Sequence, residues 1–120
     1  MKRVWRLLGL VACSCARDPP ARPEIALQLT VGESAYIHGH LDSAQAVWNA
    51  ALDRARTTRD SVGEARALTW LGLAARRSGD YIESRRLGER ALALKLHSHL
   101  TADLSKSYNA LGLLAWDEGR

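Results

Sequence analysis

The sequence predicts an all-α protein in which antiparallel helical hairpins stack as a short solenoid. Its 120 residues are rich in Ala, Leu and Arg and include only three Pro and no Phe, a composition that favours helix over strand. Six of the nine glycines fall in two columns that repeat every 40 residues, and a fixed period of this size is typical of repeat architectures. An array of this length makes one domain at most, with room for about five or six helices.

The N-terminal segment, residues 1–12, has the layout of a secretion signal. Three basic residues, Lys2, Arg3 and Arg6, precede the apolar run 7–12. A stable membrane-spanning helix needs roughly 18 to 20 apolar residues, so this run is too short to serve as an anchor by itself. We therefore expect residues 1–12 to be cleaved as a signal peptide.

Cys13 follows Leu10-Val11-Ala12, and the four residues together resemble the lipobox of bacterial lipoproteins. The resemblance implies that Cys13 is acylated on sulfur, becomes the new N-terminus and anchors the protein to a lipid membrane in the bacterial cell envelope. Several acyl chains hold a protein on a membrane where one chain is marginal. Because Ser14 rather than Asp follows the Cys, the outer membrane is favoured. The alternative is an ordinary signal cut elsewhere, which would leave a periplasmic or secreted protein.

Residues 13–23 connect this anchor to the folded part, and Pro19, Pro20 and Pro23 favour a stiff, extended tether. The charge excess also lies at this end, because residues 1–23 carry five basic side chains and one acidic side chain, which accounts for the net charge of +4. The rest of the chain carries twelve basic and twelve acidic groups. We expect no nucleic-acid partner, since the folded part lacks the basic excess that binds phosphates.

The 40-residue period defines the repeats. It aligns the positions of Gly32, Gly72 and Gly112 and those of Gly39, Gly79 and Gly119. The pattern resembles the tetratricopeptide repeat (TPR), which places Leu-Gly in the first helix of a hairpin and Gly at the turn. The positions that carry this signature are Gly32, Gly39, Leu71, Gly72, Gly79, Tyr81, Ala91, Leu111, Gly112 and Gly119.

The sequence also departs from the common TPR pattern. The usual period is about 34 residues, the closing Pro is absent at Arg56 and Leu96, and Gly88 stands where Trp48 supplies a large residue one repeat earlier. The longer period resembles the bacterial type of this repeat. The resemblance covers residues 24–120 and implies repeats at 25–64 and 65–104 and a partial repeat at 105–120.

We expect helices at 24–37, 41–58, 61–77, 81–97 and 101–117. Gly39 and Gly79 suit left-handed caps at the ends of the first helices, and His40 or Asp80 can begin the helices that follow. The segment Ser61–Glu64 is typical of a capping box that opens another helix.

The helices of each hairpin are expected to cross closely at Gly32 and Gly72, where a larger side chain would push the backbones apart. The third hairpin is expected to be truncated, because Gly119 stands at the turn that should launch its second helix and only Arg120 follows. Its single helix would then expose an apolar side. This side consists of Leu104, Tyr108, Leu111, Leu114 and Ala115.

Two histidine pairs, His38 with His40 and His97 with His99, are the only cluster that suggests a metal site. In a solenoid of hairpins, the turns within and between hairpins lie on opposite edges, so the pairs should not converge and we expect no metal. No nucleophile with a matching base, and no Gly-rich phosphate loop, appears at a suggestive spacing. We therefore expect neither catalysis nor a cofactor.

In TPR proteins the first helix of each hairpin lines a concave groove. This resemblance implies a partner-binding surface made of Tyr36, Arg66, Thr69, Leu73, Arg76, Arg77, Lys106, Asn109 and Trp116, with Ile37 and Leu113 beside them. Arginines in the middle hairpin suit the carboxylates of an acidic peptide. The alternative for Arg76 and Arg77 is a solvated helix end that interacts favourably with the helix dipole.

The sequence thus predicts a non-catalytic module that binds a protein or peptide, anchored as a bacterial lipoprotein. The alternative is the sensor region of a larger enzyme, because 40-residue bacterial repeats resemble those that precede caspase-like (CHAT) peptidase domains or signalling domains. A downstream His and Cys dyad in the same reading frame would favour that alternative.

Overall fold

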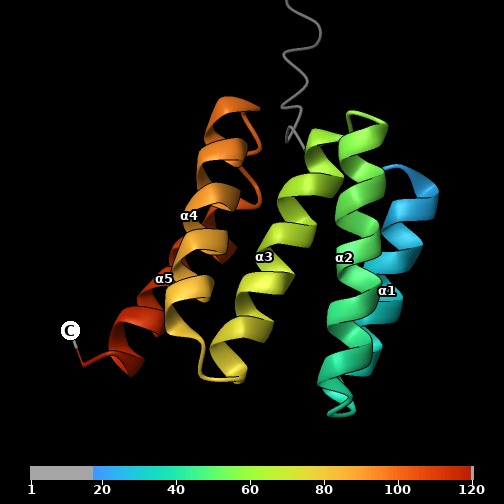
Figure 1. Cartoon of the computed structure of the whole chain (residues 1–120). Helices are drawn as coiled ribbons and strands as arrows, with labels where there is room; N and C mark the ends of the chain where they lie inside the picture. The colour runs from blue at the N-terminus through green and yellow to red at the C-terminus, as the bar shows by residue number, and fades with distance from the viewer. Residues whose placement is uncertain (1–17, 120) are drawn as a thin grey trace, which may run out of the picture.

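The computed structural model describes residues 18–119, and this part of the chain is all-helical, as predicted (Figure 1). Consecutive helices run antiparallel and pack side by side. Helices α1, α3 and α5 also contact one another in turn, so they share one face of the stack, and α2 and α4 lie on the other. The helices are α1 (Pro23–Ile37), α2 (Leu41–Thr57), α3 (Ser61–Arg77), α4 (Tyr81–His97) and α5 (Leu104–Asp117).

Four of the five helices begin and end within one residue of the expected positions, but α5 begins at Leu104 rather than at residue 101. The delay has a physical cause in the preceding turn. Left-handed His99 and Leu100, which is buried with 1% of its surface exposed, are followed by a turn in which the N–H of Leu104 donates to the carbonyl of Thr101 at 3.3 Å, and the helix begins only after this turn.

Each helix is followed by a residue whose backbone has the left-handed conformation. These residues recur every 20 positions, whereas each glycine column repeats every 40. Gly39 and Gly79 have φ of 83° and 84°, which confirms them as left-handed caps. The turns between hairpins use Arg59 and His99 in the same region, with φ of 54° and 56°. Each helix and its turn therefore form a 20-residue unit, and glycine marks only the turns within hairpins and the end of α5.

The starts of α3 and α4 are capped by aspartates. The predicted capping box beginning at Ser61 is wrong, because Ser61 is the first helical residue and Asp60 is the cap, accepting a bond of 3.0 Å from the N–H of Gly63. Asp60 is preferred to Ser61 as the cap and sets the start of α3 one residue earlier than a cap at Ser61 would. Its carboxylate both accepts a backbone N–H and interacts favourably with the helix dipole. Asp80 caps α4 as expected, whereas the side chain of His40 makes no capping bond.

Trp48 fills the core between α1 and α2. Its ring is fully buried, and its indole N–H donates to the carbonyl of Leu29 at 3.2 Å. A Cβ added at Gly32 would lie 2.2 Å from the indole Nε1, so the predicted close approach is confirmed at this glycine. At Gly72 the nearest atoms to an added Cβ are backbone atoms of α4, the carbonyl oxygen of Ser84 at 3.4 Å and the nitrogen of Gly88 at 3.5 Å, so α3 and α4 also cross closely there, although a single methyl group fits at ordinary contact distance.

Helix α5 is held by a few apolar contacts and by ion pairs at both ends. Leu114 is 1% exposed, which corrects the expectation that it lies on an open apolar side, because it packs with Leu111 against α3 and α4. Tyr108 and Trp116 remain exposed, with 57% and 80% of their surface accessible. At its C-terminal end, the last residues of α5 pair with arginines of α3 and α4. These pairs are Arg76 with Asp117 at 2.5 Å and Arg85 with Glu118.

Residues 18–22, assigned from sequence to the tether, lie against the turns at one end of the stack. Ala21 is buried at 5% exposure. Asp18 accepts the N–H of Asp103 at 3.1 Å, and Asp60 accepts the N–H of Arg22 at 2.8 Å. The predicted signal peptide and Cys13 lie outside the described residues. Between residues 18 and 119, no helix is long and apolar enough to cross a bilayer.

Candidate functional site

A hollow of about 400 Å³ lies on the face shared by α1, α3 and α5. We call it the concave hollow. One residue comes from α1, several come from α3 and α5, and Lys95 reaches it from α4. Its lining consists of Glu33, Arg66, Thr69, Trp70, Leu73, Lys95, Asp103, Lys106, Asn109, Ala110 and Leu113.

The apolar part of the hollow rests on a rigid aromatic cluster. Trp70 stacks on buried Trp48 with ring centroids 5.1 Å apart and planes inclined by 16°. Tyr36 meets the edge of Trp70 at 6.1 Å and lies 5.8 Å from Trp48. Offset stacking and edge contacts of this kind stabilise the aromatic arrangement beyond the area it buries. Together with Leu73 and Leu113, Trp70 gives the hollow a preformed apolar floor.

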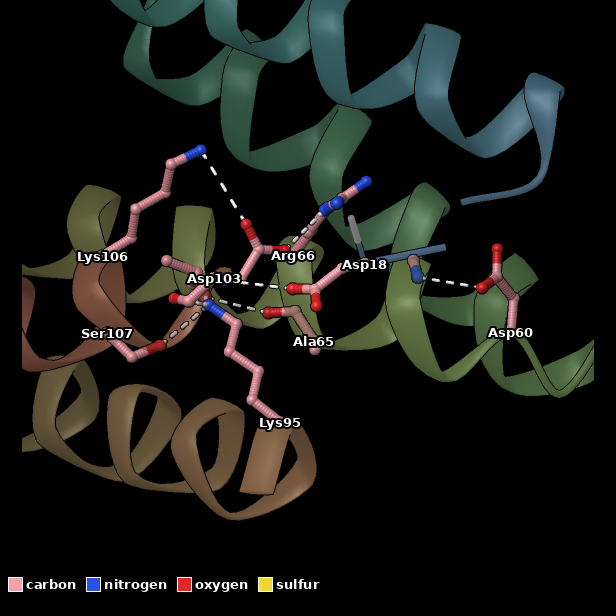
Figure 2. Close-up of polar contacts among 10 residues, drawn as sticks. Asp18, Asp60, Ala65, Arg66, Lys95, Asp103, Lys106 and Ser107 are labelled. Carbon is pink, nitrogen blue, oxygen red and sulfur yellow. Dashed lines mark hydrogen bonds and ion pairs between the residues drawn. The ribbon is translucent and has the colours of Figure 1, made fainter. Parts of the chain in front are cut away.

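The polar part of the hollow is organised around Asp103, at the start of α5 (Figure 2). The carboxylate of Asp103 accepts a bond of 2.8 Å from Nε of Arg66 and lies 4.0 Å from the ammonium of Lys106. Its side chain is only 9% exposed, whereas that of Lys106 is 75% exposed. Asp103 therefore orients two cations, one half-buried and one open to solvent, along the same wall.

Lys95 lies beneath this wall with 1% of its surface exposed. Its ammonium donates to the hydroxyls of Thr69 at 2.9 Å and Ser107 at 2.8 Å, and to the carbonyl of Asp103 at 3.3 Å. Burial lowers the pKa of Lys95, and the nearby Asp103 carboxylate partly opposes this shift. With three acceptors, Lys95 joins α3, α4 and α5 at one point beneath the hollow.

The structure gathers five of the nine predicted groove residues in the hollow: Arg66, Thr69, Leu73, Lys106 and Asn109. Leu113, predicted beside them, also lines it. The other four, Tyr36, Arg76, Arg77 and Trp116, lie outside it, as does Ile37, which was predicted beside them. Trp116 and Ile37 are exposed at the far end of their helices, at 80% and 69%, and Tyr36 is half-buried in the aromatic cluster.

Arg76 and Arg77 lie at the C-terminal end of α3, and both engage other helices. Arg76 pairs with Asp117 of α5 at 2.5 Å. Arg77 donates to the carbonyl of Tyr36 at 2.9 Å and places its guanidinium 4.6 Å from the centre of that ring. This geometry combines a charge-assisted bond with a cation–π contact. The two arginines thus connect α3 to α5 and α1 rather than line the hollow.

Sequence reasoning missed five residues that line the hollow, which are Glu33, Trp70, Lys95, Asp103 and Ala110. A signal for Lys95 was present in the repeat. The 40-residue shift aligns it with Ala55, which is fully buried, and it continues the buried stripe of Leu87 and Ala91. A lysine in a buried column indicates a polar network, because a buried charge needs hydrogen-bonding partners.

The two histidine pairs lie at opposite ends of the helices, one in the turn from α1 to α2 and the other at the end of α4 (Figure 1). Within residues 18–119, no group of three or more His, Cys, Asp or Glu side chains is placed to hold a metal ion. A second hollow of about 300 Å³ lies between α2 and α4, on the opposite face, and its charges are largely paired. The pairs there include the one between Arg86 and Glu83 at 2.6 Å.

Comparisons of the chain with protein-family models, with curated proteins and with solved structures find no match.

Proposed function

We propose that this chain is a non-catalytic binding module of the TPR kind, which holds an acidic segment of a protein or peptide in the concave hollow. The observation that carries the proposal is the hollow itself, in which an apolar floor adjoins a basic wall. A ligand site of this kind is concave and mostly apolar, with a few convergent polar groups that fix orientation.

The basic wall carries hydrogen-bond donors that can bind a ligand. Arg66 bonds Asp103 through Nε, and its two Nη groups have no partner within residues 18–119. The ammonium of Lys106 is mostly exposed, and Asn109 beside it is exposed. A guanidinium and an ammonium placed together suit a ligand carboxylate. An apolar ligand side chain next to that carboxylate would then cover Trp70 and Leu113.

The binding proposal is tested with a displayed library of random peptides selected on the full chain. Selected peptides should combine Asp or Glu with a neighbouring aromatic or aliphatic residue. Their affinity, measured by anisotropy of labelled peptide, should fall about tenfold in Lys106→Glu and in Leu113→Asp, because charge repulsion and a polar group on the floor oppose binding. Arg86→Glu makes the same charge change on the opposite face and should leave the affinity unchanged. Equal losses in all three variants, or none, would contradict the proposal.

We also propose that Cys13 is acylated and anchors the module in the bacterial cell envelope, as the lipobox-like residues suggest. In a Gram-negative host, the wild-type chain should incorporate labelled palmitate and fractionate with membranes. The variant Cys13→Ala should do neither, while Cys15→Ser should behave as the wild type. Equal labelling of wild type and Cys13→Ala would overturn the anchor.

A further inference from the structure

The end of the stack that holds residues 18–22 is fixed to the N-terminal segment at three points. Three hydrogen bonds join this segment to the turns after α2 and α4. They are the Asp103 N–H to Asp18 at 3.1 Å, the Arg22 N–H to Asp60 at 2.8 Å, and the Arg22 guanidinium to the carbonyl of Thr58 at 3.4 Å. We call this end, formed by segments 18–22, 58–60 and 98–103, the anchor edge. Figure 2 shows Asp18 and Asp60 in place on it.

The chain between Cys13 and the anchor edge is short. Five residue steps separate Cys13 from Asp18, and a fully extended chain spans at most about 17 Å over five residues. The 17-residue helices α2, α3 and α4 are about 25 Å long. An acylated Cys13 therefore keeps the anchor edge close to the lipid headgroups, while the opposite edge lies a helix length farther away.

The charges of the anchor edge suit such a surface. Arg59 on this edge and Arg54, in the last turn of α2 beside it, are exposed, and their side chains make no hydrogen bond or ion pair within residues 18–119. The three acids within these segments, Asp18, Asp60 and Asp103, all accept hydrogen bonds from the chain, whereas Glu24 at the start of α1 and Asp53 next to Arg54 are exposed. Basic side chains near an anionic leaflet add attraction that acts within about a Debye length.

We propose that the anchor edge faces the membrane, with Arg54 and Arg59 against lipid phosphates and the helices standing away from the bilayer. This inference rests on the proposed acylation of Cys13. Arg66 lies five residues into α3, about 8 Å from the anchor edge along the helix. The basic wall of the concave hollow is then held near the headgroups, where it receives a ligand segment that lies close to a membrane.

The test uses the full chain, acylated in a Gram-negative host and reconstituted into vesicles of phosphatidylethanolamine and phosphatidylglycerol that contain a headgroup-labelled acceptor lipid. Donor dye is attached through Thr101→Cys on the anchor edge or through Ser43→Cys on the opposite edge. Both positions are exposed, and neither side chain makes a hydrogen bond within residues 18–119. Cys15→Ser in both proteins prevents a second label.

Energy transfer from position 101 should exceed transfer from position 43 by about twofold or more, because the two edges are about 25 Å apart. A matched control inserts 20 Gly and Ser residues after Ala16, which leaves segment 18–22 in place. Such a linker spans about 25 Å on average, so the ratio should fall toward one. Membrane-bound protein with equal transfer from both positions overturns the proposed orientation alone. Protein that is not acylated and does not bind vesicles overturns the anchor and the orientation together.

Discussion

Replacing Gly32 by alanine places a methyl group where the indole ring of Trp48 lies. The added Cβ would stand 2.2 Å from Nε1 and 2.6 Å from two ring carbons of that indole. The ring cannot easily withdraw, because it is fully buried, bonds Leu29 through Nε1 and stacks on Trp70. The substitution at Gly112 offers a matched control, since this glycine occupies the same repeat position and an added Cβ meets nothing within 4 Å.

The expected changes in the free energy of unfolding have opposite signs in the two variants. Alanine gains about 1 kcal/mol over glycine in a helix interior, so Gly112→Ala should stabilise the fold by about that amount. Gly32→Ala receives the same gain, but overpacking costs about 1–3 kcal/mol and an unbonded buried indole N–H costs about 1–3 kcal/mol more. The net destabilisation is about 1–5 kcal/mol. Gly72→Ala should resemble Gly112→Ala, because its contacts begin at an ordinary 3.4 Å.

Urea denaturation followed by far-UV circular dichroism measures these differences as shifts of the midpoint at a constant slope. The expected order of stability is Gly112→Ala and Gly72→Ala above the wild type, and Gly32→Ala below it. If Gly32→Ala is as stable as Gly112→Ala, the indole of Trp48 does not pack tightly against Gly32 of α1.

Three further outcomes follow from the polar contacts. Burial lowers the pKa of Lys95 below its ordinary value of 10.5. Between the two pKa values the unfolded chain therefore binds more protons than the folded chain. In urea titrations, the free energy of unfolding of the wild type relative to Lys95→Met should rise as the pH increases toward 10.5. Asp80→Ala should lower the free energy of unfolding by about 1 kcal/mol through loss of a helix cap. Asp60→Ala should cost about 0.5–1.5 kcal/mol more, because Asp60 also accepts the N–H of Arg22. Equal losses would contradict the docking of segment 18–22. The side chains of Arg76 and Asp117 are both 27% exposed, so a double-mutant cycle should give a coupling energy of about 0.2–1 kcal/mol. This coupling should disappear at about 1 M salt. A coupling energy that does not change with salt would indicate another interaction.

The sequence predicted the helices well where glycine marks the turns. Gly39 and Gly79 located two caps because only glycine adopts the left-handed region without strain. Arg59 and His99 adopt the same conformation without any such signal, and the 20-residue unit was therefore missed. The start of α5 was also misplaced, since no glycine or proline marks the turn at residues 101–103, in which the N–H of Leu104 donates to the carbonyl of Thr101.

The concave hollow was predicted only in part, for a similar reason. The TPR resemblance placed Arg66, Lys106 and Asn109 on one face. The same reasoning could not foresee that Arg76 would be engaged by Asp117, because side-chain pairing across helices depends on their exact packing rather than on register along the chain. Lys95 is the instructive case, as its place in a buried column was visible in the repeat but its three acceptors come from other helices.

Residue-resolved mapping of a bound peptide would show directly whether the concave hollow is the binding site. A selected acidic peptide is titrated into the isotopically labelled protein, and changes in the amide and indole signals of the ¹H–¹⁵N spectrum are followed. The largest changes should fall on Arg66, the indole of Trp70, Lys106 and Leu113, with little change at Arg86 on the opposite face. Changes concentrated between α2 and α4 instead would contradict the assignment of the concave hollow as the binding site.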